Sequence, residues 1–291
     1  MTKAEIERVI CETTGEPAKI VSSSHVSGGC INRAETIQLK DGRKFFVKSN
    51  SNCHDDMFEC EAEGLAVIAA TNSVSVPCVV GVGMSGRTKF LVLEMIESSR
   101  KQKSFFECMG RQLAEMHRNG NSQKFGFDHD NYIGSTPQVN SWNRDWCDFW
   151  RRQRFEYQFT LARKNGYADG QFNSKAERLL NRLDQLSITG EPPALIHGDL
   201  WSGNYMVGKD GQPVLIDPAA YFGHREAEFG MTTLFGGFSR TFYESYEEVW
   251  PFESGADDRI EIYRLYHLLN HLNLFGSSYL GGCMEIINKY C

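Results

Sequence analysis

The sequence predicts an α+β protein in which most strands lie in the N-terminal third and the rest of the chain is mainly helical. Short strand-like apolar runs separated by turns dominate the chain as far as residue 94. Longer segments with apolar residues at helical spacing dominate the part that follows. The chain has 291 residues, which is enough for one large domain or two lobes. We therefore expect one lobe over residues 1–94 and the other over 95–291.

The composition is that of a globular protein and disfavours two classes of partner. Hydrophobic residues make up 41% of the chain, charged residues 23%, and the net charge is −6. An acidic balance argues against nucleic acid or an anionic membrane as the main partner. No apolar run approaches the roughly 20 residues of a membrane span. Residues 1–16 resemble neither a signal peptide nor a transit peptide, so we expect a cytoplasmic protein.

The cysteines and histidines do not form a recognisable framework. The chain has 9 Cys and 8 His, with no C-x-x-C pair and no H-E-x-x-H pattern. An odd number of cysteines argues against a complete set of disulfides, and the lack of paired Cys or His spacings argues against a zinc site. Free thiols in a reducing compartment are the better interpretation.

The first elements are a helix, a glycine-containing hairpin and a strand that ends in a lysine. Helical spacing predicts a helix over 3–14, and two strand-like runs lie within 19–38. Between these runs, Ser27-Gly28-Gly29-Cys30 would allow backbone N–H groups to approach phosphates, although a plain hairpin turn is the simpler interpretation of this loop alone. The strand 44–48 ends in Lys48, which either faces nucleotide phosphates or is a solvated edge charge.

A helix and two further strands complete the predicted N-terminal lobe. The helix over 55–70 carries three glutamates, of which one could pair with Lys48 and the others are surface charges. Strand-like runs follow at 79–82 and 89–93. The second run passes into Glu94-Met95-Ile96, where we expect a hinge whose backbone contacts adenine. The same residues could simply end the last strand of the sheet, and the two interpretations are compatible.

The C-terminal part predicts mainly helices. Apolar spacing indicates helices over 104–119, 142–162 and 173–186, another through Phe229 and Leu234, and a last one over 258–275. The aromatic residues of 142–162 are typical of a core. Residues 120–140 are expected to form a loop, and His117 is expected to be a capping or buried structural residue.

Two short apolar runs in the C-terminal half each lead into an acid. The run 194–196 is followed by Asp199 and then by Asn204, and the run 213–216 is followed by Asp217. A Lys-Asp-Gly-Gln sequence between them is typical of a hairpin turn. We therefore expect the three polar residues at strand ends on one hairpin-like scaffold.

This set of side chains suits phosphoryl transfer. Asp199 would orient the attacking hydroxyl and accept its proton, while Asn204 and Asp217 would hold the magnesium ion that bridges the phosphates. The pattern H-x-D-x-x-x-x-N followed by a later Asp is that of the protein-kinase-like fold. Gly198 replaces the Arg of protein kinases and Asp217-Pro218-Ala219 replaces D-F-G, which points to small-molecule kinases. An ordinary hairpin explains Asp199 alone, but not the whole set.

With these motifs placed, the sequence resembles the fructosamine-3-kinase (ketosamine-3-kinase) family over nearly its whole length. The most specific segments are Gly28–Ile31, Phe46–Lys48, Met57–Glu61, Ile133–Gln138, His197–Asn204, Asp217–Ala219, Tyr221–His224, Phe235–Phe238 and Leu269–His271. The resemblance implies a bilobal protein-kinase-like fold in which a small N-lobe combines an antiparallel sheet with helix C. It also implies ATP-dependent phosphorylation of the 3-hydroxyl of a ketosamine, free or protein-bound, after which the unstable phosphate restores the amine (deglycation).

The resemblance also assigns individual residues. ATP would be bound by Gly28, Gly29, Cys30, Lys48, Glu61, Glu94, Met95 and Ile96, with Lys48 paired to Glu61. Asp199 would be the catalytic base, and Asn204 and Asp217 the Mg²⁺ ligands. Trp201 and His271 would contact the sugar. The polar segment 50–56 departs from close relatives of the family without affecting this chemistry.

Three other interpretations remain open at this point. The chain could phosphorylate a different small molecule, such as an aminoglycoside or choline. It could be a pseudokinase, although Lys48, Asp199, Asn204 and Asp217 are all present. Finally, glycine-loop N–H groups and Lys48 would favour the thiolate of Cys30, making it redox-sensitive, so we expect either a monomer or a Cys30-linked homodimer. The alternative for Cys30 is an inert thiol.

Overall fold

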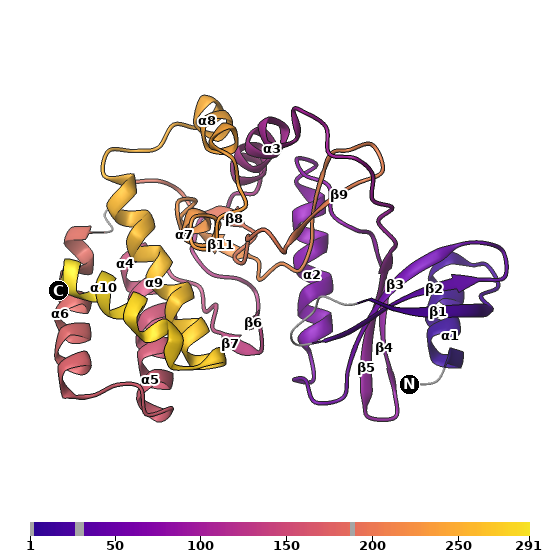
Figure 1. Ribbon diagram of the computed structural model, residues 1–291, viewed down its shortest axis with the longest axis horizontal. Helices are drawn as coiled ribbons and strands as arrows, with labels where there is room; N and C mark the ends of the chain where they lie inside the picture. The colour runs from indigo at the N-terminus through magenta and orange to yellow at the C-terminus, as the bar shows by residue number, and fades with distance from the viewer. Residues whose placement is uncertain (1–2, 27–31, 187–189) are drawn as a thin grey trace.

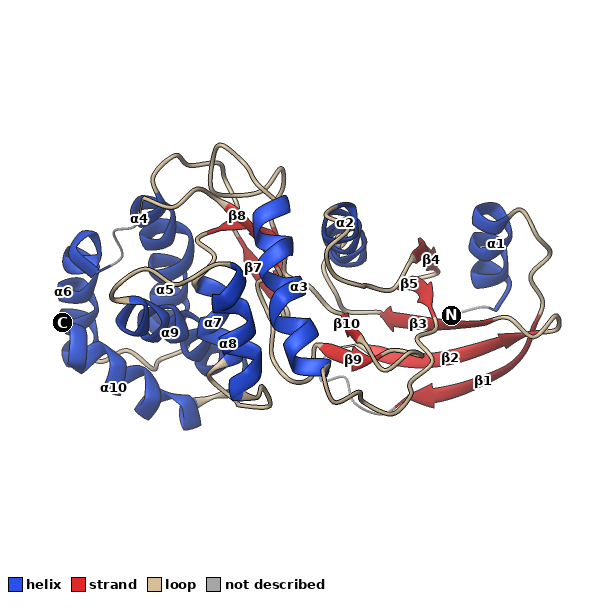
Figure 2. Ribbon diagram, turned by 90° about the horizontal axis from the view of Figure 1, so that it is seen from above, coloured by secondary structure: helices blue, strands red, loops and turns tan. Residues whose placement is uncertain are grey.

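The computed structural model describes residues 3–26, 32–186 and 190–291, arranged as two lobes (Figure 1). The strands of the large sheet lie in one lobe and most helices in the other (Figures 1 and 2). This arrangement confirms the predicted α+β fold with a small sheet lobe and a larger helical lobe. No helix within the described ranges combines the length and the apolar character needed to cross a membrane.

The small lobe is built on a five-stranded antiparallel sheet with the strand order β1-β2-β3-β5-β4. Its elements are α1 (Lys3–Thr14), β1 (Ile20–Val26), β2 (Arg33–Leu39), β3 (Lys44–Asn50), α2 (Met57–Ala70), β4 (Val79–Ser85) and β5 (Thr88–Glu94). Side chains alternate across β5, so Phe90 and Val92 pack in a cluster with α1, whereas Leu91 and Leu93 pack in another with α2. The sheet is therefore covered on one face by α1 and on the other by α2.

The large lobe is organised around the long helix α9, which packs against α5, α7 and α10. Its helices are α3 (Phe105–Asn119), α4 (Trp146–Phe149), the π-helix η1 (Trp150–Glu156), α5 (Tyr157–Lys164), α6 (Gly170–Leu186), α7 (Ala227–Thr232), α8 (Arg240–Val249), α9 (Ala256–Phe275), the 3₁₀-helix η2 (Ser277–Tyr279) and α10 (Leu280–Tyr290). Its short strands are β6 (Asn131–Ile133), β7 (Thr136–Gln138), β8 (Ala194–Ile196), β9 (Tyr205–Val207), β10 (Pro213–Leu215) and β11 (Tyr221–Gly223).

Several sequence-based expectations about the large lobe were wrong. The expected loop 120–140 contains the β6–β7 hairpin, whose strands of 3 residues are too short to show a period-2 pattern. The helix 258–275 is not the last one, because α10 follows it, and α8 was also missed. Two adjacent glycines near the start of α10 obscure its helical signal.

The expected single helix over 142–162 is also wrong at its start and in its middle. The Asp145 side chain accepts a hydrogen bond from Asp148 N at 2.7 Å, which caps the helix just before Trp146. Trp142 lies before this cap, 39% exposed and stacked on Phe222. The segment then widens into the π-helix before α5 begins. The other aromatic residues named in the prediction form core, as expected: Trp146, Phe149, Trp150 and Phe155.

The hairpin scaffold predicted around the two acids consists of two separate ladders. β8 pairs with β11 rather than with β10, and β10 pairs with β9. Both ladders are antiparallel and each has strands of 3 residues. The loop after β8 and the loop after β10 are nevertheless adjacent, because Ala219 N donates to His197 O at 2.9 Å.

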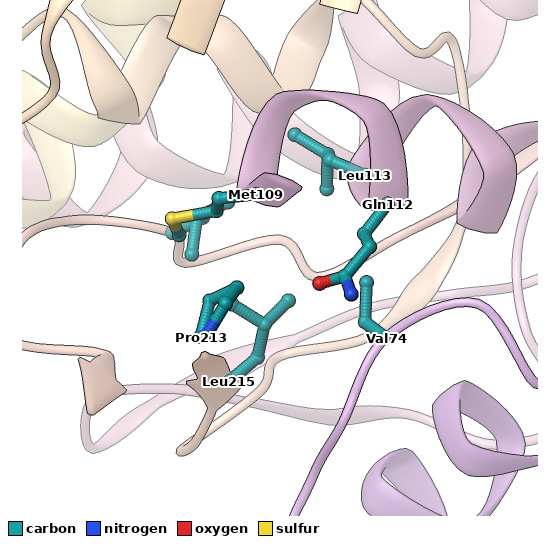
Figure 3. A pocket seen from close by; sticks show the side chains of 7 residues that line it. Val74, Met109, Gln112, Leu113, Pro213 and Leu215 are labelled. Carbon is teal, nitrogen blue, oxygen red and sulfur yellow. The ribbon is translucent and has the colours of Figure 1, made fainter. Parts of the chain in front are cut away.

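A small apolar hollow lies between α3 and β10 (Figure 3). It has no volume that a water molecule could enter, and Gln112 is its one polar lining side chain among the described residues. Gln112 Oε1 has no hydrogen-bond partner there. We interpret the hollow as a small packing defect between α3 and β10 rather than as a binding site.

Candidate active site

A cavity of about 690 Å³ lies between the two lobes and gathers most of the predicted site residues. One part is lined by β2, β3, α2 and the end of β5, and the other by the loops after β8 and β10 and by the end of α9. The predicted residues that line it are Lys48, Glu61, Glu94, Met95, Ile96, Asp199, Trp201, Asn204, Asp217 and His271. Side chains far apart in the sequence are thus brought together around one cavity.

Lys48 is buried at the centre of a carboxylate pair. Its Nζ lies 2.7 Å from Glu61 Oε1 and 2.7 Å from Asp217 Oδ1. Burial by itself would lower the pKa of Lys48, but Glu61 and Asp217 outweigh it and raise the pKa above its ordinary value, so the ammonium stays charged. Glu59 and Glu63 of the same helix are exposed, so the predicted partner, Glu61, is the one that faces the lysine.

Asp199 follows β8 and is held by Asn204. The Asn204 amide Nδ2 donates to Asp199 O at 2.8 Å and to Asp199 Oδ2 at 3.1 Å. Burial raises the pKa of Asp199, and the nearby charge of Asp217 raises it further. A carboxylate with a raised pKa is a better proton acceptor than an exposed one, which suits the role of a base.

Asp217 has a backbone conformation that is rare for a residue with a side chain. Its φ is 57°, in the left-handed region, a conformation that costs of order 1–3 kcal/mol and persists only where the surroundings enforce it. Hydrogen bonds on both sides of it do so, since Ile216 N donates to Asn204 O at 3.0 Å and Ala219 N to His197 O at 2.9 Å. The side chain is 40% exposed, in the cavity opposite Lys48.

His197 joins the two acidic loops. Its Nε2 lies 2.8 Å from Ile216 O, and because a carbonyl only accepts, Nε2 carries the proton. Its Nδ1 therefore accepts from Asp199 N at 3.3 Å. Burial lowers the pKa of His197, which keeps the ring neutral in this tautomer. The histidine of the motif is thus a structural link between Asp199 and the strand that precedes Asp217.

Glu228 supports the same loop and was not predicted from the sequence. This buried carboxylate on α7 accepts from His197 N at 2.6 Å and from Gly198 N at 3.1 Å. His117 Nε2 lies 3.5 Å from it, so the expectation that His117 is a buried structural residue is confirmed. The only signal in the sequence is an acid beside the apolar face of a short helix, which does not distinguish Glu228 from a surface charge.

Glu228→Gln should destabilise the fold and lower turnover. The glutamine amide has only one acceptor oxygen, so its NH₂ group would face the backbone N–H of either His197 or Gly198. One buried hydrogen bond to a charged group is then lost, at a cost of about 1–3 kcal/mol. Thermal unfolding measures this change, and Glu247→Gln, an exposed glutamate on α8, is the matched control. Equal unfolding midpoints for the two variants would contradict the assigned role.

A group of five aromatic rings lines the cavity, and several of them are in contact with one another. Trp201, Phe235, His271, Phe275 and Tyr279 all line it. The ring centroids of Phe235 and His271 are 4.9 Å apart, and those of His271 and Tyr279 are 5.2 Å apart. Two of the five, Trp201 and His271, were predicted as sugar contacts, and the other three were not predicted.

Comparison with models of protein families shows to which family the chain belongs. The model described as "Fructosamine kinase" matches residues 2–291.

This chain belongs to the fructosamine kinase family.

Individual relatives agree with this assignment. The chain is 44% identical over 283 residues to a chloroplastic protein-ribulosamine 3-kinase from Oryza sativa subsp. indica, covering 96% of this chain and 81% of the relative. A crystal structure from Haemophilus somnus, provisionally named a fructosamine-3-kinase, is 31% identical with a TM-score of 0.90 and covers 99% of this chain and 97% of that one. Aminoglycoside phosphotransferase APH(4)-Ia, at 16% identity and a TM-score of 0.66 over 97% of this chain and 98% of that one, shares the fold.

The departure of this chain from the protein-kinase pattern at Gly198 has a steric reason in this structure. Gly198 has φ +81°, and a Cβ at this position would lie 2.2 Å from Ala219 O. Any larger residue, including the arginine of protein kinases, would push the loop of Asp199 away from the loop of Asp217. Glycine therefore allows the close approach of the two acidic loops in this fructosamine kinase family member.

The residues predicted as the hinge line the cavity together with apolar side chains. Glu94, Met95 and Ile96 lie there with Ala34, Phe46, Leu93, Met206 and Ile216. The Glu94 carboxylate is turned toward β4, where its Oε2 accepts from Cys78 N at 3.1 Å. Apolar side chains therefore line the cavity beside the predicted hinge residues, and ligand sites for planar apolar groups are commonly lined in this way.

Gly28, Gly29 and Cys30 lie outside the described residues, in the segment 27–31 between β1 and β2. Their contact with phosphates, the redox sensitivity of Cys30 and a Cys30-linked homodimer therefore stay predictions from the sequence. The eight other cysteines are free thiols in the structure.

Proposed function

We propose that this chain is an ATP-dependent kinase that phosphorylates the 3-hydroxyl group of ketosamines, free or protein-bound. The observation that supports this most strongly is the group of Lys48, Glu61, Asp217 and Asp199 around one cavity in a fructosamine kinase family member. The relative named protein-ribulosamine 3-kinase, at 44% identity, supports a ketosamine as the acceptor. Loss of the unstable 3-phosphate would then restore the amine.

In this proposal Asp199 orients the sugar hydroxyl and takes up its proton as the oxygen attacks the γ-phosphorus of ATP. The bond from the γ-phosphorus to the bridging oxygen breaks, and ADP leaves with that oxygen. Lys48, kept charged by its two carboxylate neighbours, binds the α- and β-phosphates. Adenine contacts Glu94, Met95 and Ile96, which line the cavity and which we propose as the hinge between lobes 1–94 and 95–291.

Asn204 and Asp217 suit magnesium. Mg²⁺ is usually bound by one or two carboxylates together with substrate phosphates rather than by a complete protein cage. Asp217 offers a half-exposed carboxylate to the cavity, next to Asn204. When bound, the ion would neutralise charge on the transferring phosphoryl group.

A coupled ADP-release assay tests the proposal. Fructosamine, ribulosamine and erythrulosamine would be compared with an aminoglycoside and choline, at fixed MgATP. We expect turnover with the ketosamines and none above background with the other two acceptors. Turnover with the aminoglycoside or choline alone would favour another small-molecule kinase, and nucleotide binding without any turnover would favour a pseudokinase.

Trp201→Ala should raise the KM for the ketosamine much more than the KM for ATP. Trp201 is two residues beyond Asp199, lines the cavity and is 38% exposed, so its ring is available to cover the sugar. Trp142 is the matched control because it is 39% exposed but is not part of the cavity lining. Steady-state kinetics with each substrate varied in turn would measure both constants. A change confined to the KM for ATP would assign Trp201 to the nucleotide side.

A further inference from the structure

Five rings form what we call the aromatic collar: Trp201, Phe235, His271, Phe275 and Tyr279. Neighbouring centroids are 6.4 Å apart for Trp201 and Phe235, 4.9 Å for Phe235 and His271, 5.4 Å for His271 and Phe275, and 5.2 Å for His271 and Tyr279. Phe235 is 42% exposed and Phe275 51%, although large apolar side chains are usually covered. Exposed rings that converge on a cavity indicate a surface kept free for a ligand.

The collar contains no acid to attract a cation. The acids among the described residues that line the cavity are Glu61, Glu94, Asp199 and Asp217. Glu61 and Asp217 are paired with Lys48, and Glu94 is turned toward β4. Asp199 stands at the position of the base. A positively charged group beside the sugar would therefore have to be bound by neutral groups.

His271 is such a neutral group. Its Nδ1 lies 2.8 Å from His267 O, and since a carbonyl only accepts, Nδ1 carries the proton. Burial lowers the pKa of His271, so the ring is neutral at pH 7 and its Nε2 is an unprotonated acceptor. His267, the nearest titratable side chain on the same helix, is neutral too, because burial lowers its pKa to about 3. Lys48 is the only Lys or Arg among the described lining residues.

We infer that the aromatic collar binds the amino group of the ketosamine as its ammonium ion. The faces of Phe235, Phe275 and Tyr279 stabilise the charge through cation–π contact, and His271 Nε2 accepts an ammonium N–H. The inference rests on the proposed function, because it places the amine of the same substrate whose 3-hydroxyl faces Asp199. The consequence is substrate specificity, because a free ketose lacks the amine and its binding is not stabilised by cation–π contacts with the collar.

Paired substrates test the inference. One is an N-alkyl ketosamine and the other is the isosteric 1-O-alkyl ketose, in which an ether oxygen replaces the ammonium group. We expect wild-type protein to prefer the amine by about tenfold or more in kcat/KM, the discrimination that one or two partly desolvated cation–π contacts give. Phe235→Leu and Phe275→Leu keep an apolar side chain but remove the ring, and they should reduce this preference while the KM for ATP stays unchanged.

Two further variants sharpen the test. His271→Phe keeps a ring but removes the acceptor, so it should also reduce the preference for the amine. Phe106→Leu, a half-buried phenylalanine outside the cavity lining, is the control and should keep the wild-type ratio. Equal use of the amine and the ether by wild-type protein, or an unchanged ratio in all collar variants, would overturn the inference and leave the proposed function intact. No turnover of either substrate by wild-type protein would overturn both.

Discussion

Asp199→Asn should lower the rate of phosphoryl transfer by ~10²–10⁴-fold, the usual loss when a general base is removed. The amide has the same shape but cannot take up the proton of the sugar hydroxyl. In the wild-type protein the Asn204 amide donates to Asp199 Oδ2 at 3.1 Å. In the variant, the new amide keeps this hydrogen bond only when its oxygen, and not its nitrogen, faces Asn204, so the orientation of the side chain is less well fixed. Nucleotide binding should survive, because Lys48 and the hinge residues are untouched.

The measurement is single-turnover transfer from ATP to the ketosamine, together with titration of ADP in the presence of Mg²⁺. Asp210→Asn is the matched control, because Asp210 is an exposed acid in the turn between β9 and β10. Near-normal turnover in the Asp199 variant would remove Asp199 from the role of base. An equal loss of ADP affinity would show damage to the nucleotide side instead.

Asp217→Asn should weaken magnesium-dependent nucleotide binding by at least about 100-fold. Changes to residues that merely support a metal ligand cost 10–100-fold, so removing the charge of a direct ligand should cost no less than the upper end. Asparagine is the informative choice because it tolerates the left-handed region that Asp217 occupies at φ 57°. Asp217→Ala removes the charge too, but adds backbone strain to the effect.

Calorimetric titration of a non-hydrolysable ATP analogue over a range of Mg²⁺ concentrations measures this loss. Asn204→Ala should have a smaller effect, since an amide contributes no net charge to the site. Thermal unfolding separates the variants further, because Asp217→Ala should unfold at a lower temperature than Asp217→Asn. Identical magnesium dependence in wild type and in Asp217→Asn would exclude Asp217 as a ligand.

The parts of the site that the sequence predicted are those that local patterns specify. Alternation along one strand points Lys48 away from α1, and the spacing from Asp199 to Asn204 lies within a single loop. The family resemblance was needed to select Glu61, because helical spacing alone leaves Glu59 and Glu63 as candidates.

The parts that were missed depend on contacts between distant segments. Glu228 reaches His197 across a sequence separation of 31 residues, and no pattern around either residue encodes that contact. The pairing of β8 with β11 was missed because strands of 3 residues have almost no periodicity. The three additional rings of the collar come from the loop after α7, the end of α9 and η2, which only the tertiary fold brings together.

Of the two carboxylates paired with Lys48, that of Asp217 lies where we propose that a nucleotide phosphate binds. In this structure the Asp217 carboxylate occupies, at 2.7 Å from Nζ, the position of an anionic oxygen beside Lys48. In the proposed mechanism a phosphate would bind Lys48 and a cation would bind Asp217, so each of the two charged groups would exchange its partner for another of the same sign. Nucleotide alone would have to compete with Asp217 for the lysine, whereas nucleotide together with its metal ion gives Asp217 a new partner. Under the proposed function, the binding of nucleotide and the binding of metal would thus be thermodynamically coupled through the Asp217 carboxylate.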